Sequence, residues 1–404
     1  MEVNDIHIQL ETMLKQKSRN QWVVERESNS SFFHNSIKIR RSSNTISELV
    51  NENGVTISKC NQIKDLAVNY FMNKFNGDVS VLDDSLFEVE HERISVEESI
   101  RMDQVPSFEE IHEAVFSLGA DSAPGPDGFA DLGYSAGSVL GNLISEEQVA
   151  FMKGRNIHEN ISLASQMVNE IQIKRKDGNV GLKLDITQAF DTVSWKFVLV
   201  FFKRYGFSDW WCDWILNILN SSRIYVLVNS NPEGYFSIDR GLRQGDPLSP
   251  LIFVLIEDVL SRNITKLFRE GAMTTMVSRK GISPTHLFFA DDIMIYCKGN
   301  MKSLRSLVAL LGYYQRAYGQ TVSRAKSKIY YGGGSLRRRA TISEFLGMPI
   351  ATFPDRYLGV KVMPGAVKYH HIANVVDKIK DQLAGWKGMM LYFQDRVMLV
   401  VYDC

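Results

Sequence analysis

The sequence predicts an α/β fold in which short apolar strands carrying acidic residues alternate with amphipathic helices. The first observation is the run VGLKLDI at residues 180–186, where apolar and polar residues alternate as in a strand with one buried face. The second is the apolar run at residues 285–298, which Asp291 and Asp292 interrupt at its centre. This run predicts two buried strands joined by a very tight turn. The third is a series of segments in which apolar residues recur at helical spacing.

The composition is that of an ordinary soluble globular protein. Of the 404 residues, 45% are hydrophobic and 23% are charged, so we expect large cores and two or three subdomains. The formal net charge is zero, so the overall charge does not point to a nucleic-acid partner, although a local basic groove is compatible with it.

Cysteine usage and hydropathy favour a soluble intracellular protein. The 4 cysteines show no paired spacing, which argues against a disulfide framework or a zinc site and for a reducing compartment. The N-terminal residues MEVNDIHIQL lack the pattern of a signal peptide. The longest apolar run, LIFVLI at 251–256, is far too short to span a bilayer. We therefore expect no membrane partner, and the oligomeric state stays open.

The N-terminal part of the chain is polar and mixed in charge. Residues 14–41 interleave cations with aromatic side chains, which indicates either a solvated helix face or a surface that follows a nucleic-acid strand. Further on, Ser107 and Glu110 form a capping box that predicts a helix ending at Gly119. Residues 121–129, DSAPGPDGF, predict a turn region.

From residue 180 onward the predicted elements follow one another closely. The first strand ends near Asp185. Two helices are expected next, at 194–206 and 208–219, and then a hairpin at 223–241 that turns at Asn231, Pro232, Glu233 and Gly234. Pro247 and Pro250 open a buried helix that runs to Arg262 or beyond. A further helix follows the Asp-Asp hairpin and stops at Gly319.

The adjacent Asp291 and Asp292 need a compensating interaction. Two unit charges about 4 Å apart repel by roughly 4 kcal/mol at an effective dielectric constant near 20. One interpretation is a solvated hairpin tip, since aspartate tolerates turns. The other is a divalent metal ion, because hard oxygen ligands suit Mg²⁺. A metal site would need a further carboxylate elsewhere in the chain.

Asp185 is the best candidate for that further carboxylate. An aspartate at a strand end is often a turn former or a helix cap, and this interpretation stays open. Alternatively, a strand-end Asp followed by a helix and a strand–Asp–Asp–strand hairpin could bring three carboxylates together on one sheet. Clustered carboxylates raise one another's pKa unless cations lie among them. Two divalent ions roughly 3.5 to 4 Å apart would offset the repulsion and serve in-line nucleotidyl transfer.

An ordered set of sequence blocks covers nearly the whole chain. Three of them contain the acidic residues or lie between them: LDITQAFDTVSW at 184–195, RGLRQGDPLSPLIF at 240–253 and FADD at 289–292. Others are LKQKSRNQW at 14–22, SNSSFFH at 28–34, APGPDGF at 123–129, ISEEQVAFMKGRNIHENI at 144–161, GQTVSRAKSKIYYG at 319–332, RYLGV at 356–360 and LAGWKGMML at 383–391. With these blocks the sequence resembles the reverse transcriptases of non-LTR, LINE-type retrotransposons, in the version abundant in plant genomes.

The resemblance implies a two-metal RNA-directed DNA polymerase. Asp185, Asp291 and Asp292 would hold two Mg²⁺ ions, with Mn²⁺ as the alternative ion and the carbonyl of Ile186 as an extra ligand. Phe190 falls where the family has its steric gate, an aromatic ring that excludes the 2′-hydroxyl of ribonucleotides. From the sequence alone, Phe190 is equally a packed core residue.

The resemblance also implies roles for residues outside the aspartates. Gln244 and Gly245 would lie under the incoming nucleotide and template base, and Lys326 would serve the leaving pyrophosphate. The primer grip would be formed by Arg356, Tyr357, Leu358 and Gly359. The partners implied are an RNA template with a DNA primer and deoxynucleoside triphosphates. A nuclear location is expected from the family, although no decisive signal is visible.

The fold implied by the resemblance is a polymerase right hand. Its palm would be a small antiparallel sheet backed by helices, with incomplete fingers and a partial helical thumb. The predicted subdomains are an N-terminal extension at 1–100, partial fingers at 101–179, the palm at 180–352, and the primer grip with the start of the thumb at 353–404.

The chain departs from the family pattern in the fingers. In the family, the block GPDGF is followed by several dozen residues with a Lys and an Arg that grip the incoming triphosphate. Here residues 130–142 stand in their place and contain no Lys or Arg, which predicts an internal deletion or a misjoined exon near 130–143. Loss of these cations would cost several kcal/mol in the transition state, about tenfold in rate per 1.4 kcal/mol.

The sequence therefore leaves two functional hypotheses. We expect a fragment of a retrotransposon polyprotein, because no endonuclease domain precedes Met1 and the chain stops within the expected thumb. The first hypothesis is an RNA-directed DNA polymerase. The second is a catalytically dead remnant that at most binds nucleic acid, and a further alternative is that no stable protein accumulates.

Overall fold

The structure is a computed structural model that describes residues 30–77, 84–105, 107–109, 112, 141–152, 154–246, 248–277 and 284–365. Several predicted features lie outside these residues: most of the helix at 107–119, the turn region at 121–129, almost all of the segment 130–142, and the thumb after residue 365. The stretch at 14–41 is described only from residue 30, where helix α2 (Ser30–Ser43) begins.

The chain divides into two compact units. The N-terminal unit comprises Met1–Gly77 and Asn220–Asp239, and the main unit comprises Asp78–Leu219 and Arg240–Cys404. This division does not test the four predicted subdomains, which stay predictions. Residues 220–239, however, belong with the N-terminal unit although they lie far from it in the sequence.

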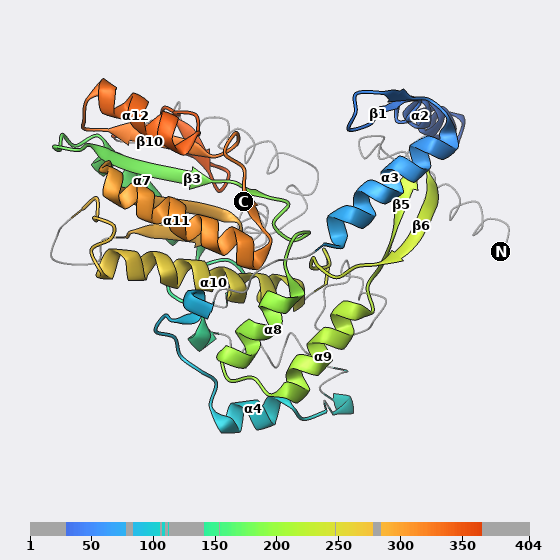
Figure 1. Ribbon diagram of the computed structural model, residues 1–404, viewed down its shortest axis with the longest axis horizontal. Coiled ribbons are helices and arrows are strands. Elements are labelled where there is room, and N and C mark those ends of the chain that lie inside the picture. Colours follow the sequence, from blue (N-terminus) through green and yellow to red (C-terminus); the bar gives the residue numbers. More distant parts are fainter. Residues whose placement is uncertain are drawn as a thin grey trace, which may run out of the picture. The chain divides into compact units, whose positions relative to one another are not determined.

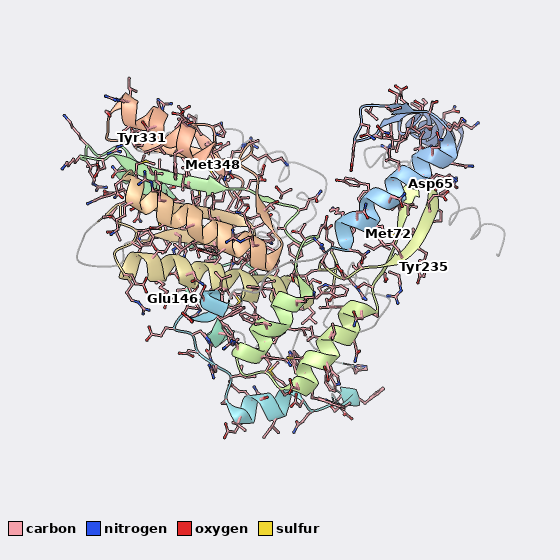
Figure 2. The ribbon with its side chains drawn as sticks, in the orientation of Figure 1. Asp65, Met72, Glu146, Tyr235, Tyr331 and Met348 are labelled. Atoms are coloured by element: carbon pink, nitrogen blue, oxygen red, sulfur yellow. The ribbon has the colours of Figure 1, made fainter. Side chains whose placement is uncertain are left out.

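The N-terminal unit packs one long helix against a hairpin (Figure 1). Its elements are α2, the strands β1 (Leu49–Val50) and β2 (Thr56–Ile57), helix α3 (Cys60–Phe75), and the strands β5 (Arg223–Val228) and β6 (Asn231–Ser237). The ammonium group of Lys64 on α3 lies 2.5 Å from a carboxylate oxygen of Glu233 on β6. Figure 2 shows Asp65 and Met72 on α3 and Tyr235 on β6.

The predicted turn of the β5–β6 hairpin was wrong. Val228 pairs with Asn231, so the turn consists of Asn229 and Ser230, which have φ of 51° and 69°. Two successive positive φ values are typical of a type I′ turn, whose twist matches that of the flanking strands. The predicted turn residue Pro232 instead lies within β6, opposite Leu227.

The main unit contains a four-stranded antiparallel sheet with the order β10-β3-β8-β7 (Figure 1). These strands are β3 (Asn179–Leu184), β7 (His286–Phe289), β8 (Asp292–Lys298) and β10 (Lys328–Gly332). The two strands predicted around the Asp-Asp pair are thus confirmed, as is the strand that ends before Asp185. The coarse prediction of a mixed α/β fold with a small antiparallel sheet holds.

Helices cover both faces of this sheet. On one face, α7 (Ile157–Ile171) buries Met167, Val168 and Ile171 in a cluster that includes Met294 and Tyr296 of β8. The opposite face meets α10 (Leu248–Arg269) and α11 (Met301–Tyr318), which lie side by side in Figure 1. The sheet is therefore the middle layer of the main unit.

The helices predicted at 194–206, at 208–219 and before Gly319 are confirmed. Helix α8 (Trp195–Arg204) begins after Ser194, whose hydroxyl accepts the N–H of Phe197, and α9 (Asp209–Asn220) follows it. Helix α11 ends at Gly319, which has a φ of 89°, the left-handed conformation common at helix ends.

Helix α10 has the predicted extent, and Asp246 caps it directly before the predicted opening residue Pro247. The Asp246 carboxylate accepts the N–H of Leu248 at 2.9 Å and so acts as the cap. Pro250 lies in the first turn, and Pro247 lies outside the described residues. Along α10 most side chains are buried, including the carboxylic residues Glu257 and Asp258.

The other described elements of the main unit are short helices and two-stranded ladders. They are η1 (Asp84–Phe87), α4 (Val96–Met102), β4 (Ile186–Thr187), β9 (Thr321–Val322), α12 (Leu336–Leu346), β11 (Asp355–Tyr357) and β12 (Val360–Val362). Strand β4 pairs with β9, and β11 with β12. Among the described helices, none is long and apolar enough to cross a bilayer.

Candidate active site

The Asp-Asp pair lies at the tip of the β7–β8 hairpin. Phe289 pairs with Asp292, so Ala290 and Asp291 form a two-residue turn and Asp292 begins β8. Because the flanking strands are buried and apolar, they leave room for a turn at one place only. The very tight turn that the sequence predicts is confirmed.

Strand register brings Asp185 to the same end of the sheet. The antiparallel β3–β8 ladder pairs Lys183 with Met294 and Leu184 with Ile293. One step beyond this ladder Asp185 would fall opposite Asp292, and the charge of Asp185 acts on Asp291. The predicted alternation also holds, since Leu182 and Leu184 are buried whereas Lys183 and Asp185 are partly exposed.

The three aspartates influence one another electrostatically. Asp291 as a whole residue is exposed at the turn, but its carboxyl group is partly shielded from solvent. This burial raises the pKa of Asp291, and the charges of Asp292 and Asp185 raise it further. The ammonium group of Lys183 lies 3.9 Å from Asp292 Oδ1. This arrangement concentrates negative charge at one end of the sheet, where a cation would be attracted.

A turn between β9 and β10 holds the backbone of Asp185. The N–H of Asp185 donates to Ser327 Oγ at 3.1 Å, and its carbonyl accepts the N–H of Ser323 at 2.9 Å. Ile186, the predicted carbonyl ligand, follows in β4 and pairs with Val322. Lys326 is exposed and lies in the same turn. Its N–H donates to Ser323 Oγ, and Ser323 and Ser327 in turn bond to the backbone of Asp185.

The hairpin predicted as the primer grip lies beside Asp292. Arg356 and Tyr357 belong to β11, and Leu358 and Gly359 form its turn, with φ of 48° and 80°. Lys183 Nζ, which faces Asp292, donates to the carbonyl of Arg356 at 3.0 Å. Burial raises the pKa of Tyr357, and the charge of Asp292 adds to this effect. The structure thus joins residues 356–357 to the acidic group.

Phe190 stacks on helix α10 at the other side of the strand end. Its ring lies 4.4 Å from that of Phe253, with 11° between the planes, and its carbonyl accepts the N–H of Leu242 at 2.8 Å. Phe190 is partly buried and stacks on the buried Phe253, so the interpretation as a packed core ring and the predicted steric gate both stay open.

Gln244 and Gly245 lie in the turn that precedes α10. Both are exposed, and Gly245 has a φ of 92°, a conformation that favours glycine. A Cβ at Gly245 would meet nothing within 4 Å, so the space over this backbone is open. The described contacts do not join these two residues to the aspartates, and their predicted roles stay predictions.

Glu257 is an acidic residue near the site that the sequence reasoning missed. It lies in the middle of α10 and is 0% exposed, and burial raises its pKa to about 8. Gln320 and Tyr314 are its polar neighbours, and the charge of Asp291 contributes to the raised pKa. A signal for a buried carboxylate was visible in the sequence, because Glu257 directly follows the apolar run LIFVLI at 251–256.

The donor set suits a hard divalent cation. Asp185, Asp291, Asp292 and the Ile186 carbonyl offer oxygen ligands, which fit Mg²⁺ or Mn²⁺ better than zinc. In the described part of the chain, no three His, Cys, Asp or Glu side chains are already arranged to hold a metal ion. The group therefore fits a metal by ligand chemistry and by its excess of negative charge, and binding would have to complete the geometry.

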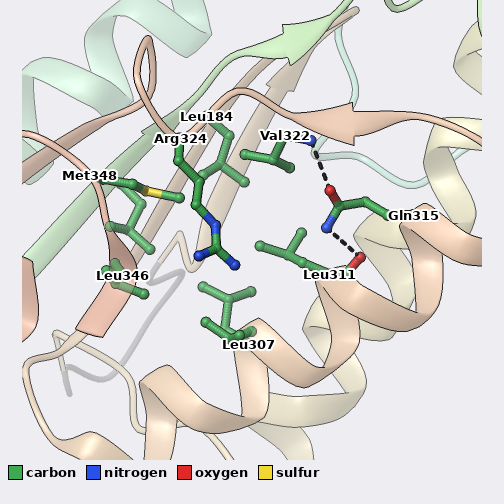
Figure 3. Close-up of a pocket in the computed structure, with 10 residues that line it drawn as sticks. Leu184, Leu307, Leu311, Gln315, Val322, Arg324, Leu346 and Met348 are labelled. Atoms are coloured by element: carbon green, nitrogen blue, oxygen red, sulfur yellow. Dashed lines mark hydrogen bonds between the residues drawn. The ribbon is translucent and has the colours of Figure 1, made fainter. Parts of the chain in front are cut away.

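A small pocket lies behind the strand that ends at Asp185 (Figure 3). Leu182 and Leu184 face it from β3, Leu307 and Leu311 from α11, and Arg324 crosses it. Its volume of about 40 Å³ would hold little more than one or two water molecules. The pocket is on the opposite face of the sheet from Lys183 and is too small to be a substrate site.

Comparison with known proteins gives consistent matches. Residues 135–362 match the family described as reverse transcriptase (RNA-dependent DNA polymerase). A retrovirus-related Pol polyprotein from the type-1 retrotransposable element R2 of Popillia japonica is 30% identical over 167 residues, which are 41% of this chain and 26% of that protein. The transposon TX1 uncharacterized 149 kDa protein of Xenopus laevis is 23% identical over 275 residues, 65% of this chain and 20% of that protein.

A solved structure is also similar at low identity. The apo telomerase of Candida tropicalis, truncated from its C-terminal domain, has a TM-score of 0.39 and 11% identity, covering 76% of this chain and 63% of that one. The chain thus spans about a quarter or less of the length of the two retroelement proteins it matches.

Proposed function

This chain belongs to the reverse transcriptase family, and from that premise we propose that it is the RNA-directed DNA polymerase of a non-LTR retrotransposon. Its template would be RNA with a DNA primer, and its substrates deoxynucleoside triphosphates. The observation that carries the proposal is the strand register that brings Asp185 to the end of the sheet where Asp292 lies, directly beside the turn residue Asp291.

The proposed metal ligands are the three aspartates and the carbonyl of Ile186. Bound Mg²⁺, or Mn²⁺, would lower the pKa of the attacking primer hydroxyl and stabilise the charge on the leaving oxygen. Metal binding would counter the raised pKa of Asp291, because a nearby cation favours its charged form. The single ammonium group of Lys183, 3.9 Å from Asp292 Oδ1, offsets only part of the charge of three carboxylates.

The other site residues would position the substrates. Phe190 would exclude ribonucleotides, which requires a ring held at a fixed distance from the sugar, and stacking on Phe253 restricts the ring in this way. Gln244 and Gly245 would contact the nucleotide and the template base, for which the open space over Gly245 leaves room. Lys326 would serve the pyrophosphate. The hairpin with Arg356 and Gly359 would hold the primer end near Asp292.

The experiment that tests the proposal is primer extension on a primed RNA template with Mg²⁺ and deoxynucleotides. Asp291→Asn keeps the size of the side chain but removes its charge, so we expect extension to fall at least about 10³-fold if a metal contact worth several kcal/mol is lost. Asp213→Asn is the matched control, because Asp213 is an exposed aspartate on α9. Equal activity of Asp291→Asn and the native chain would overturn the metal role.

The same experiment distinguishes the second hypothesis. A folded chain that binds primer–template but extends it under no condition would be a catalytically dead remnant. The sequence feature behind this alternative is the segment 130–142, which lacks Lys and Arg. The Lys and Arg side chains that this segment lacks cannot be supplied from outside the chain. The deciding result is therefore whether the native chain extends the primer with Mg²⁺.

A further inference from the structure

Gln148 is a buried polar residue whose side chain reaches the Asp-Asp turn. It is 0% exposed, and its amide oxygen accepts the N–H of Ala150 at 3.1 Å and the N–H of Ala290 at 3.1 Å. Ala290 is the turn residue directly before Asp291, and it lies 142 positions away from Gln148 in the sequence. The side chain thus joins a distant segment to the tip of the hairpin.

The bond matters because Ala290 has a backbone conformation that alanine disfavours. Its φ is 50°, in the region where glycine is usually found. In a two-residue turn the N–H of this position is not used by the strand ladder, since Phe289 and Asp292 form the last pair. Gln148 supplies the missing acceptor, and so fixes the Phe289–Ala290 peptide unit at the start of the turn, one residue before Asp291.

The backbone around Gln148 is itself anchored to β7. The N–H of Phe288 donates to the carbonyl of Glu147 at 3.0 Å, and the N–H of Val149 donates to the carbonyl of Phe288 at 3.2 Å. Gln148 stands in a parallel bridge with Phe288 between these two bonds. A rotation of the side-chain amide that exchanges its oxygen and nitrogen is unfavourable, because it would turn the NH₂ group toward two N–H donors. The acceptor is therefore held in place from both sides.

We propose that Gln148 is a positioning residue for the acidic site: by holding the Ala290 peptide, it sets the direction in which the Asp291 carboxylate leaves the turn. This inference rests on the proposed function, since direction matters only if Asp291 binds a metal ion. Partners that orient a metal ligand typically contribute 10- to 100-fold to metal affinity or activity, and we expect an effect at the lower end, about tenfold.

The test compares Gln148→Met with Asn160→Leu. Methionine has nearly the shape of glutamine but no comparable acceptor for the Ala290 N–H. Asn160 is the matched control, because it is also buried and also bonds to β7, donating to the carbonyl of Phe288 at 2.9 Å, two residues before Ala290. Two quantities are measured on the full chain: the affinity for Mn²⁺ by titration without substrate, and hydrogen exchange of the Ala290 amide.

We expect Gln148→Met to weaken Mn²⁺ binding about tenfold and to accelerate exchange at Ala290. Asn160→Leu should change the Mn²⁺ affinity by less than about twofold even if it lowers thermal stability as much. Gln148→Asn, which keeps a buried amide but is one methylene shorter, is the milder second variant and should change both quantities in the same direction. Unchanged Mn²⁺ affinity in the Gln148 variants, despite faster exchange, would overturn the inference.

Two results separate the inference from the function on which it rests. If Asp291→Asn binds Mn²⁺ as tightly as the native chain, the proposed metal role is wrong. If Asp291→Asn loses binding and Gln148→Met does not, only the positioning role is wrong. Rapid exchange of the Ala290 amide in the native chain would also refute the inference, whether or not any variant folds.

Discussion

The hairpins β7–β8 and β5–β6 are built alike but differ in their surroundings. Each has a two-residue turn, at Ala290–Asp291 in the first and at Asn229–Ser230 in the second. The β7–β8 strands are buried on both faces: Phe288 and Ile293 on one face are 0% exposed, and Leu287 and Met294 on the other are 2% and 1% exposed. The β5–β6 strands alternate, and the exposure of their outer side chains is high: Tyr225 55%, Leu227 65% and Tyr235 75%.

The difference explains why one turn was predicted correctly and the other was not. In β7–β8 the apolar residues on both sides leave only the acidic pair for a turn, so burial fixes the register. In β5–β6 two neighbouring groups of turn formers compete, Asn229–Ser230 and Asn231–Gly234, and the exposed face does not choose between them. The strand twist, which a local sequence pattern does not contain, favours the first.

The largest expected contrast is in side-chain truncation. Phe288→Ala should lower the stability of the β7–β8 hairpin by about 3–5 kcal/mol, because the ring is fully buried. Tyr225→Ala should change that of β5–β6 by no more than about 0.5 kcal/mol. The local stability of each hairpin is measured by hydrogen exchange on the full chain, followed separately for residues of each hairpin. A single unfolding curve would not serve, because a chain with two units need not unfold in one step. Equal losses would mean that the burial difference does not exist in solution.

The second contrast is in pH dependence. His286 on β7 is fully buried, bonded to Ser261 and Thr285, and burial lowers its pKa to about 3. The unfolded chain takes up this proton near pH 6.5 and the folded chain does not, so stability should fall between pH 6.5 and 3 by up to about 1.4 kcal/mol per unit. Hydrogen exchange at several pH values should show this for native β7 but not for His286→Gln, with β5–β6 as internal reference.

A smaller effect is expected at Gly234 in β6. Its φ is 59°, and a Cβ there would lie 2.5 Å from a methyl group of Val68 on α3. Gly234→Ala should therefore lower the stability of the N-terminal unit by about 1–2 kcal/mol, which limited proteolysis across β5–β6 would detect. Gly54→Ala is the control, because Gly54 lies in the same unit and has a φ of 76°, but a Cβ there would meet nothing within 4 Å. An equal or larger loss at Gly54 than at Gly234 would show that backbone strain, and not the contact with Val68, decides.

The smallest effect, and of opposite sign, is expected at Ser230. Its φ of 69° suits glycine, so Ser230→Gly would create the Asn-Gly pair that type I′ turns favour. We expect a gain of up to about 1 kcal/mol, because relief of the left-handed strain, about 1–2 kcal/mol, exceeds the entropic cost of glycine, about 0.5–1 kcal/mol. Slower hydrogen exchange in β5 and β6 would show this gain. No gain would indicate that the turn is not at Asn229–Ser230 in solution, and that the predicted turn at Asn231–Gly234 should be reconsidered.

Much of the candidate site could be predicted because strand patterns are local. Alternation places Asp185 at a strand end, and the interrupted apolar run places Asp291 and Asp292 in a tight hairpin. Neither pattern contains the register between β3 and β8, which comes from the sheet as a whole. The assignment of residues 356–359 as the primer grip rests on family resemblance alone and stays a prediction, and the bond from Lys183 to Arg356 has no local signal.

The rest of the site depends on which polar side chains become buried. Gln148 and Glu257 are polar residues, and each is buried by segments far away in the sequence. The grouping of Asn220–Asp239 with the N-terminal unit has the same origin, since α3 supplies the partner for β5 and β6. Contacts of this kind join segments that lie far apart in the chain, and local patterns in a single sequence do not predict them.

The two outer strands of the central sheet are each bonded to a neighbouring segment. Residues 147–149 bond to β7, and on the other side Ile329 of β10 bonds to Pro349 and Ala351 at 2.9 and 2.8 Å. Free strand edges are the places where sheets of different molecules join and aggregate. A variant that detaches either segment should thus lose solubility before it loses its fold, and concentration-dependent light scattering would be the first sign of damage.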